Sequence, residues 1–216
     1  MSRGGEAGAP GDGLGTGPGP GYPAPAGEGR GELREKGSRF LAVVAPAAGE
    51  AEAEAVLARL RAEHPDATHH CFAWRLGPEA RERASDAGEP SGTAGAPILQ
   101  VLRGHGLSDA VAVVVRWFGG TKLGKGGLAR AYAAAAREAV EATPRVRRVP
   151  RVTLAVDLPY ERVGAVKRLV HPPEVELADE RYGERARLEL AVREDRAAEV
   201  EAALADLGVG WVERPG

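Results

Sequence analysis

One stretch of the sequence restricts the fold more than any other. Residues 109–118 read DAVAVVVRWF, an almost continuous apolar run rich in valine. Such a run is typical of a strand that is buried on both faces, so we expect a central strand of a sheet. Residues 128–140 then read LARAYAAAAREAV, and their alanine content predicts a helix that Pro144 ends. The middle of the chain is therefore predicted to run from strand through a glycine-rich connection into a helix.

The residues before this centre predict further elements of the same domain. β-Branched and aromatic residues indicate strands, and apolar residues at helical spacing indicate helices. We expect a strand at 38–45, a helix at 49–63, a strand at 69–76 and a short helix at 95–102. Residues 77–97 show no apolar period and predict a loop of about twenty residues, a length that is usually functional or mobile.

The pattern restarts at Arg151. It predicts strands at 151–158, 175–182 and 185–192, helices at 160–170 and 195–207, and a closing strand at 209–212. The order βαββαβ is the ferredoxin-like arrangement. The predicted fold class is thus α+β with two domains.

Glycine, proline and charge set the expected domain boundaries. Residues 1–31 hold twelve of the 30 glycines, a composition that buries too little apolar surface to fold, so we expect a disordered tail. A functional tail is the alternative, although no Lys/Arg run supports it. The first domain is expected at 32–144, a charged linker ending in proline at 145–150, and the second domain at 151–216.

Composition also limits the setting and the chemistry. Cys71 is the single cysteine, which rules out an intramolecular disulfide and the Cys/His spacing of structural zinc sites. No apolar run reaches the roughly 20 residues that span a bilayer, and the N-terminus lacks the apolar core of a signal peptide. We therefore expect a cytoplasmic protein without membrane attachment, metal or other cofactor.

The charged residues are unevenly distributed between the two predicted domains. Residues 116–148 hold eight basic and two acidic side chains, a balance of +6. Residues 151–216 hold ten basic and fourteen acidic side chains, a balance of −4. The first domain is therefore the one that is expected to attract an anionic partner.

The connection between the central strand and the alanine-rich helix is the main candidate site. Its five glycines allow backbone N–H groups to converge at a helix N-terminus, which favours an anion such as phosphate. Lysine and arginine side chains add full charges. The candidate nucleic-acid or anion-binding residues are Arg116, Gly119, Gly120, Lys122, Lys125, Gly126, Gly127 and Arg130.

Two other interpretations of this segment compete with anion binding. Residues 119–125 match most of a P-loop, but Gly126 stands where a Ser or Thr hydroxyl would hold magnesium, so nucleotide hydrolysis is not expected. Alternatively, the glycines only make a close-packed turn and the lysines are solvated.

A second candidate region combines a strand with the long loop. His69 and Cys71 share one strand face and His70 lies on the other, a spacing that suits two metal ligands but equally a buried histidine beside an inert thiol. Asp86 and Glu89 suggest paired carboxylates that could act as general acid and base with a histidine. In the alternative, Asp86 and Ser91 cap turns, and Glu89 pairs with Arg116 to fix the loop over the glycine segment.

Four segments together resemble the YigZ/IMPACT family: KGSRF at 36–40, HPDATHHC at 64–71, DAGEPSGTAG at 86–95 and RWFGGTKLGKGGLARAY at 116–132. The resemblance covers residue 32 to about 215. It implies a first domain like the second domain of ribosomal protein S5 and a second domain like a ferredoxin-like domain of translation factor EF-G. Ala87, Trp117 and Lys125 depart from the family pattern. Lys125 adds positive charge, and Trp117 either packs in the core or offers a face to a base.

The leading hypothesis is a non-catalytic, translation-related regulator that binds RNA, the ribosome or another phosphate-bearing ligand through the basic glycine segment. One alternative is an enzyme that acts on a phosphorylated small molecule or nucleotide with His69, His70, Asp86 and Glu89. Another is a regulator that binds a protein partner. Eukaryotic relatives act through such a partner, but they use an additional domain that this sequence lacks.

Overall fold

The computed structural model describes residues 21–209 and 212–213. These residues form two compact units, which divide between Arg148 and Val149. Both units combine helices with antiparallel sheets, so the predicted α+β class with two domains is confirmed. The division falls inside the segment 145–150 that was predicted as a linker.

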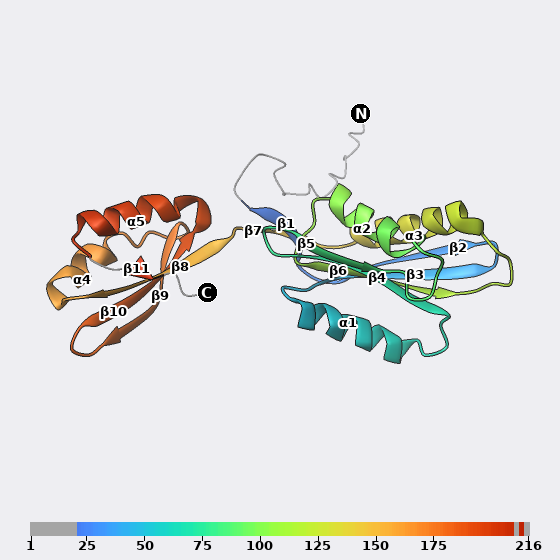
Figure 1. Ribbon diagram of the computed structural model, residues 1–216, viewed down its shortest axis with the longest axis horizontal. Helices are drawn as coiled ribbons and strands as arrows, with labels where there is room; N and C mark the ends of the chain where they lie inside the picture. Colours follow the sequence, from blue (N-terminus) through green and yellow to red (C-terminus); the bar gives the residue numbers. More distant parts are fainter. Residues whose placement is uncertain (1–20, 210–211, 214–216) are drawn as a thin grey trace, which may run out of the picture. The chain divides into compact units, whose positions relative to one another are not determined.

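The N-terminal unit is a five-stranded antiparallel sheet with the strand order β2-β3-β6-β4-β5. Helix α1 covers one face, and α2 and α3 cover the other (Figure 1). Its elements are β1 (Tyr22–Pro25), β2 (Gly29–Glu35), β3 (Ser38–Pro46), α1 (Glu50–Glu63), β4 (His69–Leu76), β5 (Arg81–Ser85), α2 (Gly95–Gly104), β6 (Ala110–Trp117), α3 (Gly124–Glu141) and β7 (Arg145–Arg148).

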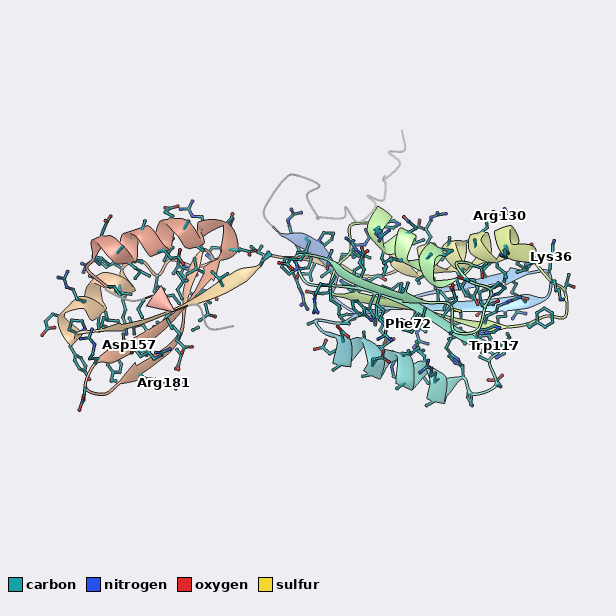
Figure 2. The ribbon with its side chains drawn as sticks, in the orientation of Figure 1. Lys36, Phe72, Trp117, Arg130, Asp157 and Arg181 are labelled. Carbon is teal, nitrogen blue, oxygen red and sulfur yellow. The ribbon has the colours of Figure 1, made fainter. Side chains whose placement is uncertain are left out.

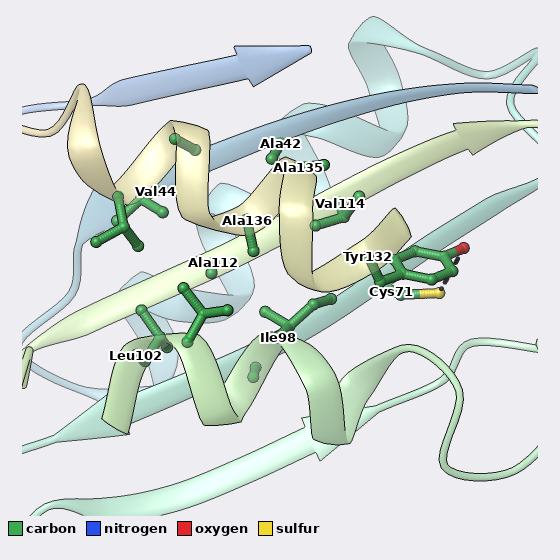
Figure 3. Packing of buried hydrophobic residues seen from close by; sticks show 14 of the residues in the cluster. Ala42, Val44, Cys71, Ile98, Leu102, Ala112, Val114, Tyr132, Ala135 and Ala136 are labelled. Carbon is green, nitrogen blue, oxygen red and sulfur yellow. Dashed lines mark hydrogen bonds between the residues drawn. The ribbon is translucent and has the colours of Figure 1, made fainter. Parts of the chain in front are cut away.

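Strand β6 is central, as its apolar run predicted. Side chains alternate between the two faces of a strand, so successive valines enter different cores. Val113 and Val115 join the core under α1, whereas Val114 joins the core under α2 and α3. Figure 3 shows this second core, where small residues such as Ala135 and Ala136 let α3 lie close to the sheet. The alternation also places Arg116 on the α2/α3 face.

Two glycines of β2 correct the predicted disordered tail. A Cβ on Gly29 would lie 2.3 Å from the Ala139 carbonyl oxygen, and a Cβ on Gly31 would lie 2.6 Å from the Ala139 nitrogen. Only glycine allows the backbone of α3 to approach the strand so closely. The prediction is therefore wrong for residues 21–31, because Gly29 and Gly31 serve close packing in an ordered strand. Residues 1–20 lie outside the described residues.

The predicted linker is also partly wrong, because residues 145–148 form a strand. β7 pairs with β1, and Tyr22 lies opposite Arg148. The buried carboxylate of Asp109 accepts hydrogen bonds from the Tyr22 hydroxyl and from an Arg148 guanidinium nitrogen, both at 2.8 Å. Burial, and next the hydrogen bond to Asp109, raise the pKa of Tyr22 to about 12. Only residues 149–150 remain as a connection to the next strand.

The long loop predicted at 77–97 is shorter in the structure. Strand β5 pairs with β4 and forms one edge of the sheet, although its sequence RERAS has no apolar alternation. A sheet edge tolerates charged side chains, which explains why the hydrophobic pattern did not reveal it. The remaining loop, residues 86–94, leads into α2.

The C-terminal unit has the strand order β11-β8-β10-β9 and is antiparallel throughout. This arrangement confirms the ferredoxin-like prediction. Its elements are β8 (Arg151–Leu158), α4 (Tyr160–Lys167), β9 (Val175–Tyr182), β10 (Ala186–Arg193), a short 3-10 helix (Glu194–Arg196), α5 (Ala197–Asp206) and β11 (Val212–Glu213). Alternate residues such as Leu154 and Leu188 form the core.

Many charged side chains of the C-terminal unit pair with one another. Arg187 binds Asp157 at 2.9 Å, and Arg151 binds Glu176 at 2.8 Å. Figure 2 shows Asp157 and Arg181 at the surface of this unit, and Arg181 pairs with Asp179. Such pairs balance most of the positive charges among the described residues of this unit.

Candidate anion-binding site

The site is built where β6 passes into α3. A loop of residues 118–123 joins the two elements, and α3 begins at Gly124 rather than at the predicted residue 128. Gly124 has φ +72° and Gly120 has φ +87°, which L side chains rarely adopt. Gly126 and Gly127 therefore belong to the first turns of the helix and not to a loop.

The N-terminus of α3 has the features of an anion-binding site. The N–H groups of Gly124, Lys125 and Gly126 have no earlier helical carbonyl to bind, and no side chain in the described part of the chain caps them. The first turn also contains no acidic residue. Lys122 precedes this turn and Arg130 follows it. Both side chains are exposed, and neither has an ion pair among the described residues. The positive end of the helix dipole and these positive side chains therefore attract an anion together.

Gly119 has a structural role instead. Its N–H donates to the Ser38 hydroxyl at 3.2 Å, so this amide is not available to a ligand. A Cβ on Gly119 would lie 1.9 Å from the carbonyl carbon of Gly37 in the β2–β3 turn. Gly119 therefore serves a close-packed turn, which was the alternative to anion binding, and its amide does not bind a ligand. The contact brings the β2–β3 turn beside the loop, and Figure 2 shows Lys36 of that turn at the same end of the unit as Arg130.

Arg116 was predicted to bind an anion, but its side chain is buried. Only 4% of it is exposed, and its Nη1 lies 2.5 Å from Oε1 of Glu89, while its Nη2 donates to Ser38 at 3.2 Å. Its charge is therefore balanced inside the protein and does not add to the surface potential. The reason is the strand alternation, which turns Arg116 into the α2/α3 core. The predicted pairing of Glu89 with Arg116 is confirmed.

Glu89 is the centre of a buried polar network. The Tyr132 hydroxyl donates to its Oε1 at 2.7 Å, and Nε2 of His69 lies 3.9 Å from the same oxygen. Cys71 Sγ lies 3.4 Å from the Tyr132 hydroxyl, as Figure 3 shows. Burial is the main reason that the pKa of Tyr132 is raised and that the pKa of Cys71 rises to about 12. The thiol stays protonated at neutral pH.

Asp86 orders the loop that carries Glu89. Its carboxylate accepts three backbone N–H groups, from Gly92 at 2.8 Å, Ala94 at 2.9 Å and Gly95 at 2.8 Å. Burial opposes ionisation, but the three hydrogen bonds outweigh it and lower the pKa of Asp86. The predicted capping role of Asp86 is confirmed.

The two histidines are separated by the sheet. Nδ1 of His69 lies 2.9 Å from the Ala87 carbonyl oxygen, on the side of Glu89. His70 lies on the opposite face, where burial and then the nearby Arg61 lower its pKa. His70 is thus no part of the site. Across residues 21–209 no three His, Cys, Asp or Glu side chains gather as a metal site requires.

A pocket of about 340 Å³ lies between the Glu89 loop and the start of α3. Its lining combines two buried charged residues, two exposed lysines and several apolar side chains: Glu89, Pro90, Arg116, Phe118, Lys122, Leu123, Gly124, Lys125 and Leu128. The volume is within the range of small-ligand sites.

Phe118 also lines this pocket, although it was not among the predicted site residues. Its ring is 47% exposed and lies 5.5 Å from the guanidinium carbon of Arg116. Trp117, which was considered for base stacking, belongs to the other face, where its Nε1 donates to Asp66 at 2.9 Å and its ring packs against His64. Strand alternation from Val115 onward would have predicted both positions.

Comparisons with known proteins agree with this architecture. Residues 36–140 match the Impact N-terminal domain, and residues 156–210 match a domain of unknown function, DUF1949. The IMPACT family member YigZ of Escherichia coli (strain K12) is 36% identical over 181 residues, which cover 82% of this chain and 89% of the relative. The chain belongs to the IMPACT family.

Further relatives of this IMPACT-family chain are known. An IMPACT family member of Thermus thermophilus is 46% identical over 145 residues, or 67% of this chain and 78% of the relative. A solved structure titled "Crystal structure of an hypothetical protein" is 34% identical, covers 90% of this chain and 96% of its own, and has a TM-score of 0.68. In the part of the IMPACT-family chain that the structure describes, no helix is long and apolar enough to cross a membrane.

Proposed function

We propose that this IMPACT-family protein is a non-catalytic, translation-related regulator that binds RNA or the ribosome in the cytoplasm. The phosphate groups of the partner bind at the N-terminus of α3, where Lys122, Lys125 and Arg130 supply the charges. The uncapped first turn of an 18-residue helix, with exposed lysines and no acidic residue in that turn, is the observation that carries the proposal.

The distribution of the remaining charges supports the choice of this surface. Arg116 is neutralised by Glu89, so the free positive charge lies on the loop and the first turns of α3. In the C-terminal unit arginines such as Arg187 and Arg193 bind neighbouring carboxylates instead. The N-terminal unit is therefore the part that contacts phosphate in this proposal.

The test is the salt dependence of binding to a single-stranded RNA. A variant with Lys122→Ala and Lys125→Ala should bind more weakly, and its slope of log K against log salt should fall by roughly 1.4, which is about 0.7 for each lost phosphate contact. The matched control is Arg162→Ala with Arg168→Ala, which removes the same charge from the C-terminal unit. If both double variants bind with the slope of the unmodified protein, the loop is not the binding surface.

One observation favours a second candidate, an enzyme that acts on a phosphorylated small molecule or nucleotide. His69 and Glu89 converge, with 3.9 Å between Nε2 and Oε1, and Glu89 lines the pocket. In this candidate a ligand held by the lysines would give a proton to, or take one from, His69 or Glu89. Turnover of a phosphorylated compound that disappears in His69→Asn, while the variant still binds that compound, would support this candidate over pure binding.

A further inference from the structure

The pocket beside α3 is lined by groups that phosphate binding does not require, among them the carboxylate of Glu89 and the ring of Phe118. Oε1 of Glu89 is occupied by Arg116 and Tyr132, but no hydrogen bond reaches Oε2 among the described residues. The side chain of Glu89 is 4% exposed, and it lines the pocket. Oε2 is not one of the fully buried atoms without a partner, so it is accessible and can accept a hydrogen bond from a ligand in the pocket.

Arg116 leaves a second unpaired group at the same place. Its Nη1 and Nη2 have partners, whereas its Nε is buried without one. The Arg116–Glu89 pair is neutral as a whole, so the net charge of the pocket comes from Lys122 and Lys125. The Arg116 Nε is fully buried, so the groups open to a ligand are the lysines and Oε2 of Glu89, and a ligand must combine an anionic group with a hydrogen-bond donor.

Phe118 adds an aromatic surface to these polar groups. Its half-exposed ring borders the pocket and stands over the Arg116 guanidinium. Flat rings of nucleobases stack on such a side chain without regard to base identity. With a volume of about 340 Å³, the pocket is at the small end of ligand sites and suits one such unit rather than a duplex.

We propose that this pocket holds a single ribonucleotide unit of an RNA strand. Its base stacks on Phe118, its phosphate lies against Lys122, Lys125 and the first amides of α3, and its 2′-hydroxyl donates to Oε2 of Glu89. The inference rests on the proposed RNA-binding function and adds the selectivity of the site. A deoxynucleotide has no 2′-hydroxyl, so the protein distinguishes RNA from DNA at this position.

The test compares ligands on the unmodified full chain. Fluorescence anisotropy measures the binding of a short single-stranded RNA, the same sequence as DNA, and the RNA with 2′-fluoro groups, which cannot donate. RNA should bind about tenfold more tightly than both, the value of one hydrogen bond to a charged acceptor. Equal affinities for all three strands overturn the inference and leave the proposed function intact. Failure to bind any strand overturns both.

Competition identifies the source of the ribonucleotide. Free adenosine monophosphate should displace the labelled RNA only weakly, since neighbouring phosphates of the strand also contribute to affinity. If the free nucleotide binds more tightly than the strand, the RNA assignment is wrong and the pocket serves a small molecule.

Two variants then test the assigned groups. Glu89→Gln should bring the RNA-to-DNA affinity ratio close to one, and this ratio does not depend on the fraction of protein that is folded. Glu161→Gln, an exposed carboxylate of the C-terminal unit, is the control and should leave the ratio unchanged. Phe118→Ala should weaken RNA and DNA binding about tenfold and equally, the effect of one lost stacking contact. A ratio that stays at ten in Glu89→Gln contradicts the role of Glu89.

Discussion

Gly119 and Gly126 lie seven residues apart in the same segment, and the structure predicts opposite effects when each is replaced by alanine. At Gly119 the new Cβ would lie 1.9 Å from the Gly37 carbonyl carbon and 2.3 Å from the Ser38 nitrogen. Real Cβ contacts almost never fall below 3.0 Å, so the two backbone segments would have to separate by about 1 Å. Backbone atoms cannot rotate away as the end of a side chain can.

The expected cost of Gly119→Ala has two parts. Overpacking of a closely packed contact costs about 1 to 3 kcal/mol. The separation also breaks the hydrogen bond from the Gly119 N–H to Ser38, which contributes about 1 kcal/mol. The N-terminal unit should therefore lose about 2 to 4 kcal/mol of its free energy of unfolding.

Gly126→Ala is the matched variant. A Cβ there would meet only the end of the Arg130 side chain, at 3.4 Å. Gly126 is already helical, and alanine favours a helix over glycine by up to about 1 kcal/mol. This variant should be as stable as the unmodified protein or slightly more stable.

Urea unfolding followed by tryptophan fluorescence measures both effects. Trp74 and Trp117 belong to the N-terminal unit, so a Trp211→Phe background restricts the signal to that unit. The unfolding midpoint should fall in Gly119→Ala and should not fall in Gly126→Ala. Equal midpoints in the two variants would refute the argument that position 119 requires glycine because two backbone segments approach closely there, rather than because the loop is flexible.

Three further outcomes follow from other contacts. Gly31→Val should lower the free energy of unfolding of the N-terminal unit by about 3 kcal/mol, measured by the same urea assay, because α3 must move away from β2. Cys71 should resist iodoacetamide in the native protein and react only after unfolding, as mass spectrometry would record, because its thiol is buried with a pKa of about 12. The lowered pKa of Asp86 means that its stabilisation is complete above the ordinary aspartate pKa and is lost as the pH falls toward the folded value. At neutral pH, Asp86→Asn should therefore have a lower free energy of unfolding than the unmodified protein. On acidification it should lose less of that free energy than the unmodified protein does, which urea unfolding at several pH values would measure.

The C-terminal unit shows what periodicity can predict. The bounds expected for its first strand, 151–158, and for its third element, 175–182, agree with β8 and β9. Alternating apolar residues specify such strands directly, because one face is buried and the other is solvated. The predicted closing strand, 209–212, overlaps β11 (Val212–Glu213) at Val212, and residues 210–211 lie outside the described residues.

Composition was a poorer guide than periodicity in the N-terminal unit. Gly29 and Gly31 occur in a glycine-rich context, and nothing local separates them from the glycines before residue 21. Their role depends on the close approach of α3, which begins at Gly124, far away in the sequence. Such a non-local packing requirement cannot be inferred from a window of neighbouring residues.

The candidate site was likewise predictable only in part from the sequence. The sequence identified the segment, its lysines and the pairing of Glu89 with Arg116. It did not identify Arg116 as buried or Phe118 as the exposed ring, because charge was counted along the chain without regard to strand alternation. Applying that alternation to β6 separates Arg116 from Trp117 without any structural information.

The pairing of β1 with β7 has a consequence for synthesis of the protein. Tyr22 lies opposite Arg148, so its place in the β1–β7 pair cannot be completed until 126 further residues have been translated. At ribosomal rates of about 5 to 20 residues per second, this wait lasts roughly 6 to 25 s. The N-terminal unit therefore closes late, when the first strand of the next unit is about to leave the ribosome.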